Sequence, residues 1–381
     1  MRDNESNYRV QRSAAAVCLA LALLGVVSLA AGFFLAPQRT WLGVFVACNF
    51  LLGLGLGGLV FVALHYVTGA KWSLPLLRVP EAMTAVLPVA AAGMAVVLPV
   101  LFFQYSAWGS SAVPLRRLWL NPPFFLARSL IYVAVWMAFG AAIVRNSRRQ
   151  DGERGTLGGA PTERNLRLSA FFLVAFGLTC WLSSSDWLMS LEPNWASTIY
   201  GVYNFSGLFL SALAAVALLV IWLRRRAPMR AAVNADHLHD LGALLFAFSS
   251  FWMYIWFCQY LLIWYVNNPE ETAYYRERLH GPWTVWLFLD LALNWAVPFV
   301  VLLFRSAKRS PWLLGAVALL VLAGRWVDLS LMILPTQGSA SEPPGLVDAG
   351  LALGTVGVFV LVVLWSLQRT PLVPTHEPVQ T

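Results

Sequence analysis

Five ionisable side chains stand inside stretches of the sequence that are otherwise almost wholly apolar. They are Arg128, Asp186, Asp290, Arg325 and Asp328. A carboxyl group in such surroundings can take up and release a proton, or it can form an ion pair with a guanidinium. Ionisable residues within membrane-spanning helices commonly lie on proton or ion pathways, so these five are candidate functional residues.

The spacing of these residues predicts two ion pairs. Arg325 and Asp328 are three residues apart, so they lie on one face of a helix. Arg128 and Asp186 fall at similar depth on successive spans and can pair across a helix bundle. Both pairs could serve only to hold helices in register, because a buried ion pair needs no chemical role. Asp290 has no cation on its own helix, which favours proton transfer at that position.

A second group of polar residues is expected at the opposite end of the spans, and its members are His65, Glu81, His239 and Asp240. An acid at a helix start can also cap the helix, which is the alternative for Glu81. A histidine beside a carboxylate can exchange protons near neutral pH. Four polar residues between the two groups could support bound water or helix–helix contacts, namely Ser249, Ser250, Tyr254 and Gln259.

Long apolar runs must position these side chains. A bilayer core of about 30 Å requires roughly 20 helical residues. Ten runs meet this length, at 13–35, 41–67, 80–105, 123–145, 166–190, 197–223, 237–266, 283–304, 310–334 and 345–367. The chain of 381 residues is 59% hydrophobic and only 12% charged, roughly half the usual charged fraction. We therefore expect an all-α integral membrane protein with ten transmembrane helices.

Arginine and lysine concentrate in alternate connections between these runs. The basic segments are 1–12, 68–79, 145–165, 224–236 and 305–309. The positive-inside rule then makes both termini, 1–12 and 368–381, cytoplasmic. Because the arginines stand between apolar runs, they read as topology signals for the lipid bilayer, and nucleic-acid binding is not expected.

The sequence offers no ligand set for a cofactor. Its four cysteines stand singly in apolar runs, without metal or iron–sulfur spacing. His65, His237 and His239 lie at the edges of spans, and no pair of histidines faces across the interior as a membrane haem needs. We expect no metal and no redox cofactor bound by this chain, with quinone or quinol as a candidate ligand.

A faint internal repeat suggests two related halves. Basic residues follow the fourth and eighth spans, and Asp186 and Asp328 each stand seven residues before a proline. The repeat predicts two related four-helix bundles, at 41–190 and 197–334. The helices 13–35 and 345–367 would then be peripheral.

Three segments resemble a known family of membrane subunits. They are WSLPLLRVPEAM (72–83), SSDWLMSLEPNWASTIYGVY (184–203) and FWMYIWFCQYLLIWYVNNPEET (251–272). They are similar to ActF-type subunits, the second NrfD-like (PsrC-like) integral membrane subunit of bacterial alternative complex III, a quinol:cytochrome c oxidoreductase. The resemblance covers nearly all ten spans and places Asp186 in its DWLMSLEP motif.

This resemblance implies a respiratory electron-transport complex of the bacterial inner membrane. Its other subunits would be an ActC-like paralogue, an iron–sulfur/molybdopterin-like subunit, and multihaem and monohaem cytochromes c, with a terminal oxidase as a further partner. Haem c and iron–sulfur clusters would reside in those partners, and quinol oxidation would belong mainly to the ActC-like subunit. The present chain would be non-catalytic or quinone-interacting, and would contribute a proton path, energy coupling or a quinone-facing surface.

Other functions fit the same sequence. The chain could be a structural membrane scaffold for redox subunits, or the membrane anchor of a related polysulfide-reductase-like complex. A stand-alone secondary transporter is disfavoured, because no inverted repeat and no pair of Gly/Pro-interrupted helices is present.

Overall fold

The computed structural model of the chain describes residues 11–104, 118–152, 160–192, 195–335 and 342–374. Within these residues the chain folds into helices, and no strand element is present. Ten helical segments are long and apolar enough to cross a membrane, as the sequence predicts. They are Arg12–Leu35, Pro37–Thr68, Arg78–Phe103, Pro122–Asp151, Thr162–Leu191, Tyr200–Leu223, Ala235–Val266, Trp283–Leu302, Pro311–Ile333 and Leu346–Leu367.

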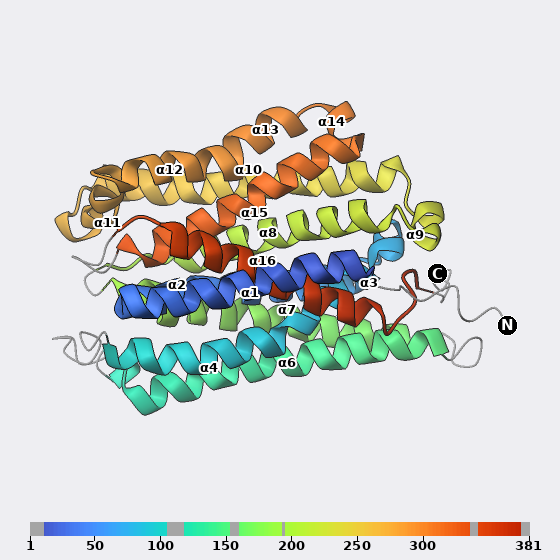
Figure 1. Cartoon of the computed structure of the whole chain (residues 1–381), viewed down its shortest axis with the longest axis horizontal. Coiled ribbons are helices and arrows are strands. Elements are labelled where there is room, and N and C mark those ends of the chain that lie inside the picture. Colours follow the sequence, from blue (N-terminus) through green and yellow to red (C-terminus); the bar gives the residue numbers. More distant parts are fainter. Residues whose placement is uncertain (1–10, 105–117, 153–159, 193–194, 336–341, 375–381) are drawn as a thin grey trace.

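The long helices lie side by side along one axis (Figure 1). They are α1 (Arg12–Leu35), α2 (Pro37–Thr68), α4 (Leu87–Gln104), α6 (Pro122–Gly152), α7 (Ala160–Ser183), α8 (Tyr200–Leu223), α10 (Ala235–Val266), α15 (Pro311–Ile333) and α16 (Leu346–Leu367). Helices α12 (Trp283–Leu291) and α13 (Val297–Leu302) together belong to one further span. Shorter helices join them: α3 (Arg78–Met83), α9 (Ala227–Ala232), α11 (Pro269–Leu279) and α14 (Arg305–Arg309).

Two helices, α2 and α8, form the centre of the molecule. In the most apolar stretch of each of these two helices, 83% of the residues are buried, whereas only 6% are buried in the corresponding stretch of α1. Helix α2 contacts α4, α7 and α8, and α8 also contacts α10 and α15. The close approach of α2 to α8 depends on small residues, because a Cβ atom at Gly57 of α2 would overlap Ala212 of α8. Helix α1 packs along α16, with Gly25 against Gly354.

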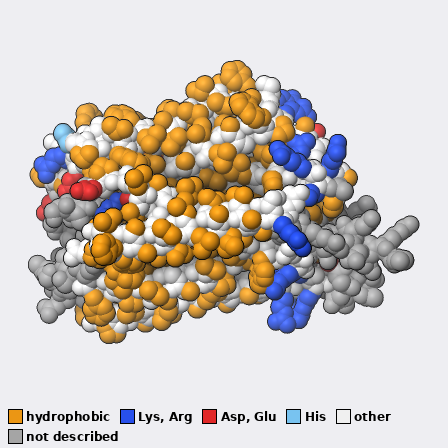
Figure 2. All heavy atoms as spheres, in the orientation of Figure 1, with side chains coloured by type: hydrophobic (Ala, Val, Ile, Leu, Met, Phe, Trp, Pro, Cys, Tyr) orange, Lys and Arg blue, Asp and Glu red, His pale blue; other side chains and the backbone are white. Residues whose placement is uncertain are grey.

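The surface divides into an apolar belt and two polar ends (Figure 2). Lysine and arginine gather at the end that carries α9, α14 and the carboxyl terminus, which we call the basic end. The opposite end carries α11 and is called the α11 end. With the ten apolar helices, this belt makes the chain a multi-pass membrane protein.

Two π-helical segments interrupt the regular helices. Ser184–Leu188 continues α7, and Ala292–Ala296 joins α12 to α13. Each segment contains a buried polar residue of the candidate site, Asp186 in the first and Asn294 in the second. Such wide turns are rare and recur at functional sites.

Candidate functional site

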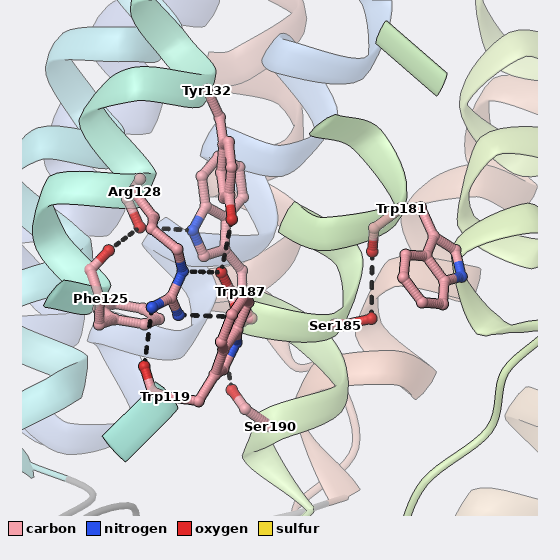
Figure 3. A network of polar contacts seen from close by, with 10 residues as sticks. Trp119, Phe125, Arg128, Tyr132, Trp181, Ser185, Trp187 and Ser190 are labelled. Atoms are coloured by element: carbon pink, nitrogen blue, oxygen red, sulfur yellow. Dashed lines mark hydrogen bonds and ion pairs between the residues drawn. The ribbon is translucent and has the colours of Figure 1, made fainter. Parts of the chain in front are cut away.

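Asp186 is buried at the α11 end and accepts four hydrogen bonds. Its side chain is 1% exposed. Arg128 of α6 donates from Nε to Oδ2 at 3.1 Å and from Nη2 to Oδ1 at 3.0 Å. Trp119 donates from Nε1 to Oδ1 at 2.7 Å, and the Tyr132 hydroxyl donates to Oδ2 at 2.9 Å (Figure 3). The ion pair predicted from helix depth is present, and the carboxylate is fully satisfied as an anion.

The Arg128 guanidinium is fixed on several sides. It lies 4.1 Å from the Trp119 ring centroid and 4.3 Å from that of Phe124. Its Nη1 also donates to the Trp119 carbonyl at 2.8 Å. A cavity of about 270 Å³ adjoins the pair, and Asp186 lies in its wall together with Trp119, Ser185 and Ser190. Within the cluster, Asp186 and Trp119 therefore border this cavity, whereas Arg128 does not line it.

Asp328 of α15 forms a second buried cluster of the same kind. Arg325 donates from Nη1 to Asp328 Oδ2 at 2.5 Å, and the Tyr203 hydroxyl donates to Oδ1. The predicted ion pair between residues three apart is thus confirmed. Asp328 is 0% exposed, and Gly207 of α8 makes room for the pair, since a Cβ atom there would overlap Arg325 Nη1.

A short polar bridge connects the two clusters. Arg325 donates from Nη2 to Asn204 Oδ1 at 2.5 Å, and Asn204 donates from Nδ2 to Ser184 Oγ at 2.9 Å. Ser184 precedes Asp186 by two residues in the same π-helical segment. A cavity of about 20 Å³ lies at this bridge, lined among others by Asn49, Ser184, Asn204 and Arg325. This volume holds about one water molecule with several polar partners.

Asp290 lies nearby but is bonded differently. It is 1% exposed, and Oδ1 accepts a hydrogen bond from Asn294 Nδ2 at 2.7 Å. Its Oδ2 is buried without a hydrogen-bond partner, and no described cation forms an ion pair with it. Asn294 adjoins the Asp328 cluster, because a Cβ atom at Gly324 would lie 2.7 Å from Asn294 Oδ1. Asp290 is therefore the least satisfied of the buried carboxyl groups.

Glu81 belongs to a buried ion cluster at the basic end. Arg78 forms ion pairs with both Glu81 and Asp151, and it donates to Ser147 Oγ at 3.2 Å. Ser147 in turn donates to Glu81. Glu81 lies in the first turn of α3, as expected of an acid at a helix start, but its carboxylate binds the Arg78 and Ser147 side chains and makes no capping hydrogen bond. Arg78 and Asp151 were not predicted for this cluster: Arg78 counted only as one of the basic residues at the end of a span, and Asp151 lies 73 residues from Arg78 in the chain.

The other residues predicted for the basic end lie in separate contacts. His65 Nδ1 is 2.7 Å from Ser73 Oγ. His239 Nδ1 is 3.5 Å from Asp240 Oδ1, with side chains 28% and 43% exposed. These two are on α10, away from the α3 cluster that holds Glu81. The predicted group of four is thus divided among different helices.

The four polar residues of α10 do not form one row. Ser249 donates to the Asn294 carbonyl at 2.6 Å, whereas Ser250 donates to the Phe246 carbonyl of its own helix at 3.0 Å. Tyr254 is 61% exposed on the outer surface. Gln259 accepts from Ser197 at 3.3 Å and donates to the Tyr275 hydroxyl at 3.2 Å. Ser249 and Gln259 thus make contacts between helical segments, as one of the two alternatives expected, whereas Ser250 bonds to its own helix and Tyr254 faces outward.

Several site residues escaped sequence analysis because they are uncharged. Tyr132 follows Arg128 by four residues, so its place on the same helix face could have been read from spacing. Tyr203 and Asn204 are polar residues inside the apolar helix α8, which is a weaker signal. Nothing in the sequence predicted that Trp119 bonds to Asp186, because Trp119 precedes α6 and its contacts do not follow from helix spacing.

Among the residues that the structure describes, no group of three or more His, Cys, Asp or Glu is placed to hold a metal ion. The cysteines are free thiols, at Cys18, Cys48, Cys180 and Cys258. Comparison with known protein families finds no match for this sequence, and comparison with curated proteins finds none either.

Proposed function

We propose that the chain is a cofactor-free membrane subunit of a quinol-oxidising respiratory complex of the alternative complex III type, and that it conducts protons. The resemblance of its DWLMSLEP and QYLLIWYVNNPEET segments to ActF-type subunits supports the family. The proposed location is the bacterial inner membrane, with the basic end and both termini cytoplasmic, as the positive-inside rule requires. The helix contacts support two four-helix bundles centred on α2 and α8.

The observation that carries the proton-conducting role is the buried carboxyl of Asp290. Charging an isolated carboxyl away from water is costly unless a cation or several donors compensate. Asp290 Oδ2 has no donor, and Asn294 supplies one hydrogen bond to Oδ1. A carboxyl so placed can hold a proton inside the membrane and give it up when a neighbouring charge changes.

The neighbouring clusters supply the rest of an outer half-path. From Asp290 the path passes the Asp328–Arg325 pair, next to Gly324. It then crosses the water-sized cavity at Asn204 and Ser184, and it ends at Asp186 beside the larger cavity of the α11 end. The proposed partners are an ActC-like paralogue, an iron–sulfur subunit and cytochromes c, whose cofactors would carry the electrons.

Two measurements test this proposal. Tagged chain purified from its native membranes should bring with it subunits that contain covalently bound haem c, detected by absorption and haem staining. In proteoliposomes of the purified complex, Asp290→Asn should lower the number of protons moved per electron while quinol oxidation continues in the presence of an uncoupler. Asp348→Asn is the matched control, because this acid forms an ion pair with Arg39 at the start of α16.

Absence of haem c from the purified material would contradict the family. An unchanged proton-to-electron ratio in Asp290→Asn would contradict the proton path. The second candidate function is a structural scaffold, which is favoured by the fully bonded Arg128–Asp186 and Arg325–Asp328 pairs. A scaffold predicts that Asp290→Asn leaves both the ratio and the turnover unchanged.

A further inference from the structure

A groove of about 620 Å³ opens at the basic end between the start of α4, the end of α6 and the end of α16. One part of its lining is apolar and includes Leu87, Pro88, Met137, Ala141 and Val144. The other part carries four guanidinium groups, those of Arg145, Arg148, Arg149 and Arg369. We call this the basic groove.

Among the residues that the structure describes, no carboxylate lines the basic groove. The nearest acid in sequence to its arginines, Asp151, is ion-paired with Arg78. Four guanidinium groups around one hollow repel each other unless an anion lies between them. The charge of the groove is therefore complementary to a ligand with more than one negative charge.

The arginines are partly held in place but keep donors free. Arg148 donates from Nη2 to Ser366 Oγ at 2.9 Å, yet its buried Nε has no acceptor among the described residues. Arg369 lies over the Trp365 ring at 3.6 Å from the centroid, which fixes its guanidinium and leaves its N–H groups available. Guanidinium N–H groups suit phosphate oxygens, which accept them in pairs.

The position of the groove indicates an amphiphilic ligand. Met137 and Arg145 are eight residues apart on α6, about 12 Å along the helix axis. The apolar lining thus runs from the row of arginines toward the apolar belt that Figure 2 shows. A small anion would satisfy the arginines but would leave this apolar wall uncovered.

We propose that the basic groove binds an anionic phospholipid of the surrounding bilayer. The phosphate groups would lie among the four arginines, and an acyl chain would lie along α6 between Met137 and Val144. Basic pockets between transmembrane helices at the cytoplasmic side are suited to such head groups. Cardiolipin, with two phosphates, matches the four guanidinium groups and is the probe for the test.

The test compares two triple variants of the full-length chain in nanodiscs or detergent. R145Q/R149Q/R369Q removes three exposed arginines of the groove, whereas R225Q/R230Q/R305Q removes three exposed arginines of the same end that do not line it. Bound cardiolipin is counted by native mass spectrometry, and its affinity is measured by titration. The groove variant should bind cardiolipin roughly 100-fold more weakly than the unmodified chain, and the control should bind it nearly as tightly.

Two further arms separate the possible ligands. Phosphatidylcholine should bind no differently to the groove variant and to the unmodified chain, because its head group has no net charge. Inorganic phosphate at the same concentration should not raise the unfolding temperature, whereas cardiolipin should raise it in the unmodified chain and in the control variant. Equal loss of cardiolipin from both triple variants, or protection by phosphate alone, would overturn the proposal.

Discussion

Arg128 of α6 and Asp186 of the segment Ser184–Leu188 form a two-pronged ion pair, with Nε–Oδ2 and Nη2–Oδ1 distances of 3.1 and 3.0 Å. The two side chains are only 8% and 1% exposed. Removing one partner leaves the other charge buried and unpaired. Arg128→Gln and Asp186→Asn should each lower the free energy of unfolding by about 3–5 kcal/mol, measured by unfolding in mixed micelles.

The double variant R128Q/D186N provides the decisive comparison. It removes both charges, so its loss of stability should be clearly smaller than the sum of the two single losses. The matched control is the Arg39–Asp348 pair, which is also joined by a 3.0 Å contact, from Nη2 to Oδ2, but whose side chains are 16% and 13% exposed. R39Q should cost only about 1 kcal/mol. Strict additivity at Arg128 and Asp186 would show that the pair does not act as a unit.

The Arg325–Asp328 pair depends on a glycine of a neighbouring helix. A Cβ atom at Gly207 would overlap Arg325 Nη1 and lie 2.9 Å from Asp328 Oδ2. Gly207→Ala should therefore destabilise the fold by about 1–3 kcal/mol, despite the higher helix propensity of alanine. Gly177→Ala on α7 is the control, because nothing lies within 4 Å of a Cβ atom there. Thermal unfolding of the two variants should separate them clearly, and equal unfolding temperatures would contradict the overlap.

The ten spans could be predicted from the sequence because crossing a bilayer requires about 20 consecutive apolar residues, and apolar runs of this length are rare in other helices. The pairing of Arg325 with Asp328 could be predicted from helix periodicity alone. The Arg128–Asp186 pair required only similar depth on successive helices. Span length and the spacing of Arg325 and Asp328 are local features of the printed sequence, whereas the Arg128–Asp186 pair also required that successive spans lie side by side.

Contacts between distant segments could not be predicted in this way. Arg78 is three residues from Glu81 in the sequence, but Ser147 and Asp151, which complete this ion cluster, belong to the end of α6. The Asn204–Ser184 bridge depends on how α8 packs beside the end of α7. Tyr254 was misassigned because polarity within a span does not say which face of the helix meets the protein and which meets lipid.

Glu277 on α11 should make stability depend on pH. The side chain is exposed on one side, but desolvation by the surrounding protein raises the pKa of this carboxyl, and the nearby Glu192 raises it further. A carboxyl whose folded-state pKa is raised binds its proton more tightly in the folded chain, so stability falls as pH rises from about 4.3 through the raised pKa. Glu277→Gln should flatten this fall in a series of unfolding temperatures from about pH 4 to pH 7. Glu270→Gln, which removes an acid from the same helix and leaves Glu277 in place, is the control variant.

Arg278 anchors α11 to the membrane-spanning helices. It is 2% exposed, and it donates from Nε to the Leu331 carbonyl at 2.9 Å and from Nη2 to Glu192 Oε1 at 3.2 Å. Arg278→Gln cannot make both bonds and leaves Glu192 without its cation, so α11 should open locally more often than the spans. Amide hydrogen exchange within 269–279 should become at least about tenfold faster, equivalent to a loss of about 1.4 kcal/mol in local stability, while exchange in α8 stays unchanged. Arg276→Gln is the control, because Arg276 is exposed on the same helix. If the two variants exchange alike, the anchor must lie in the aromatic contacts of α11, such as the stacking of Tyr274 on Trp195.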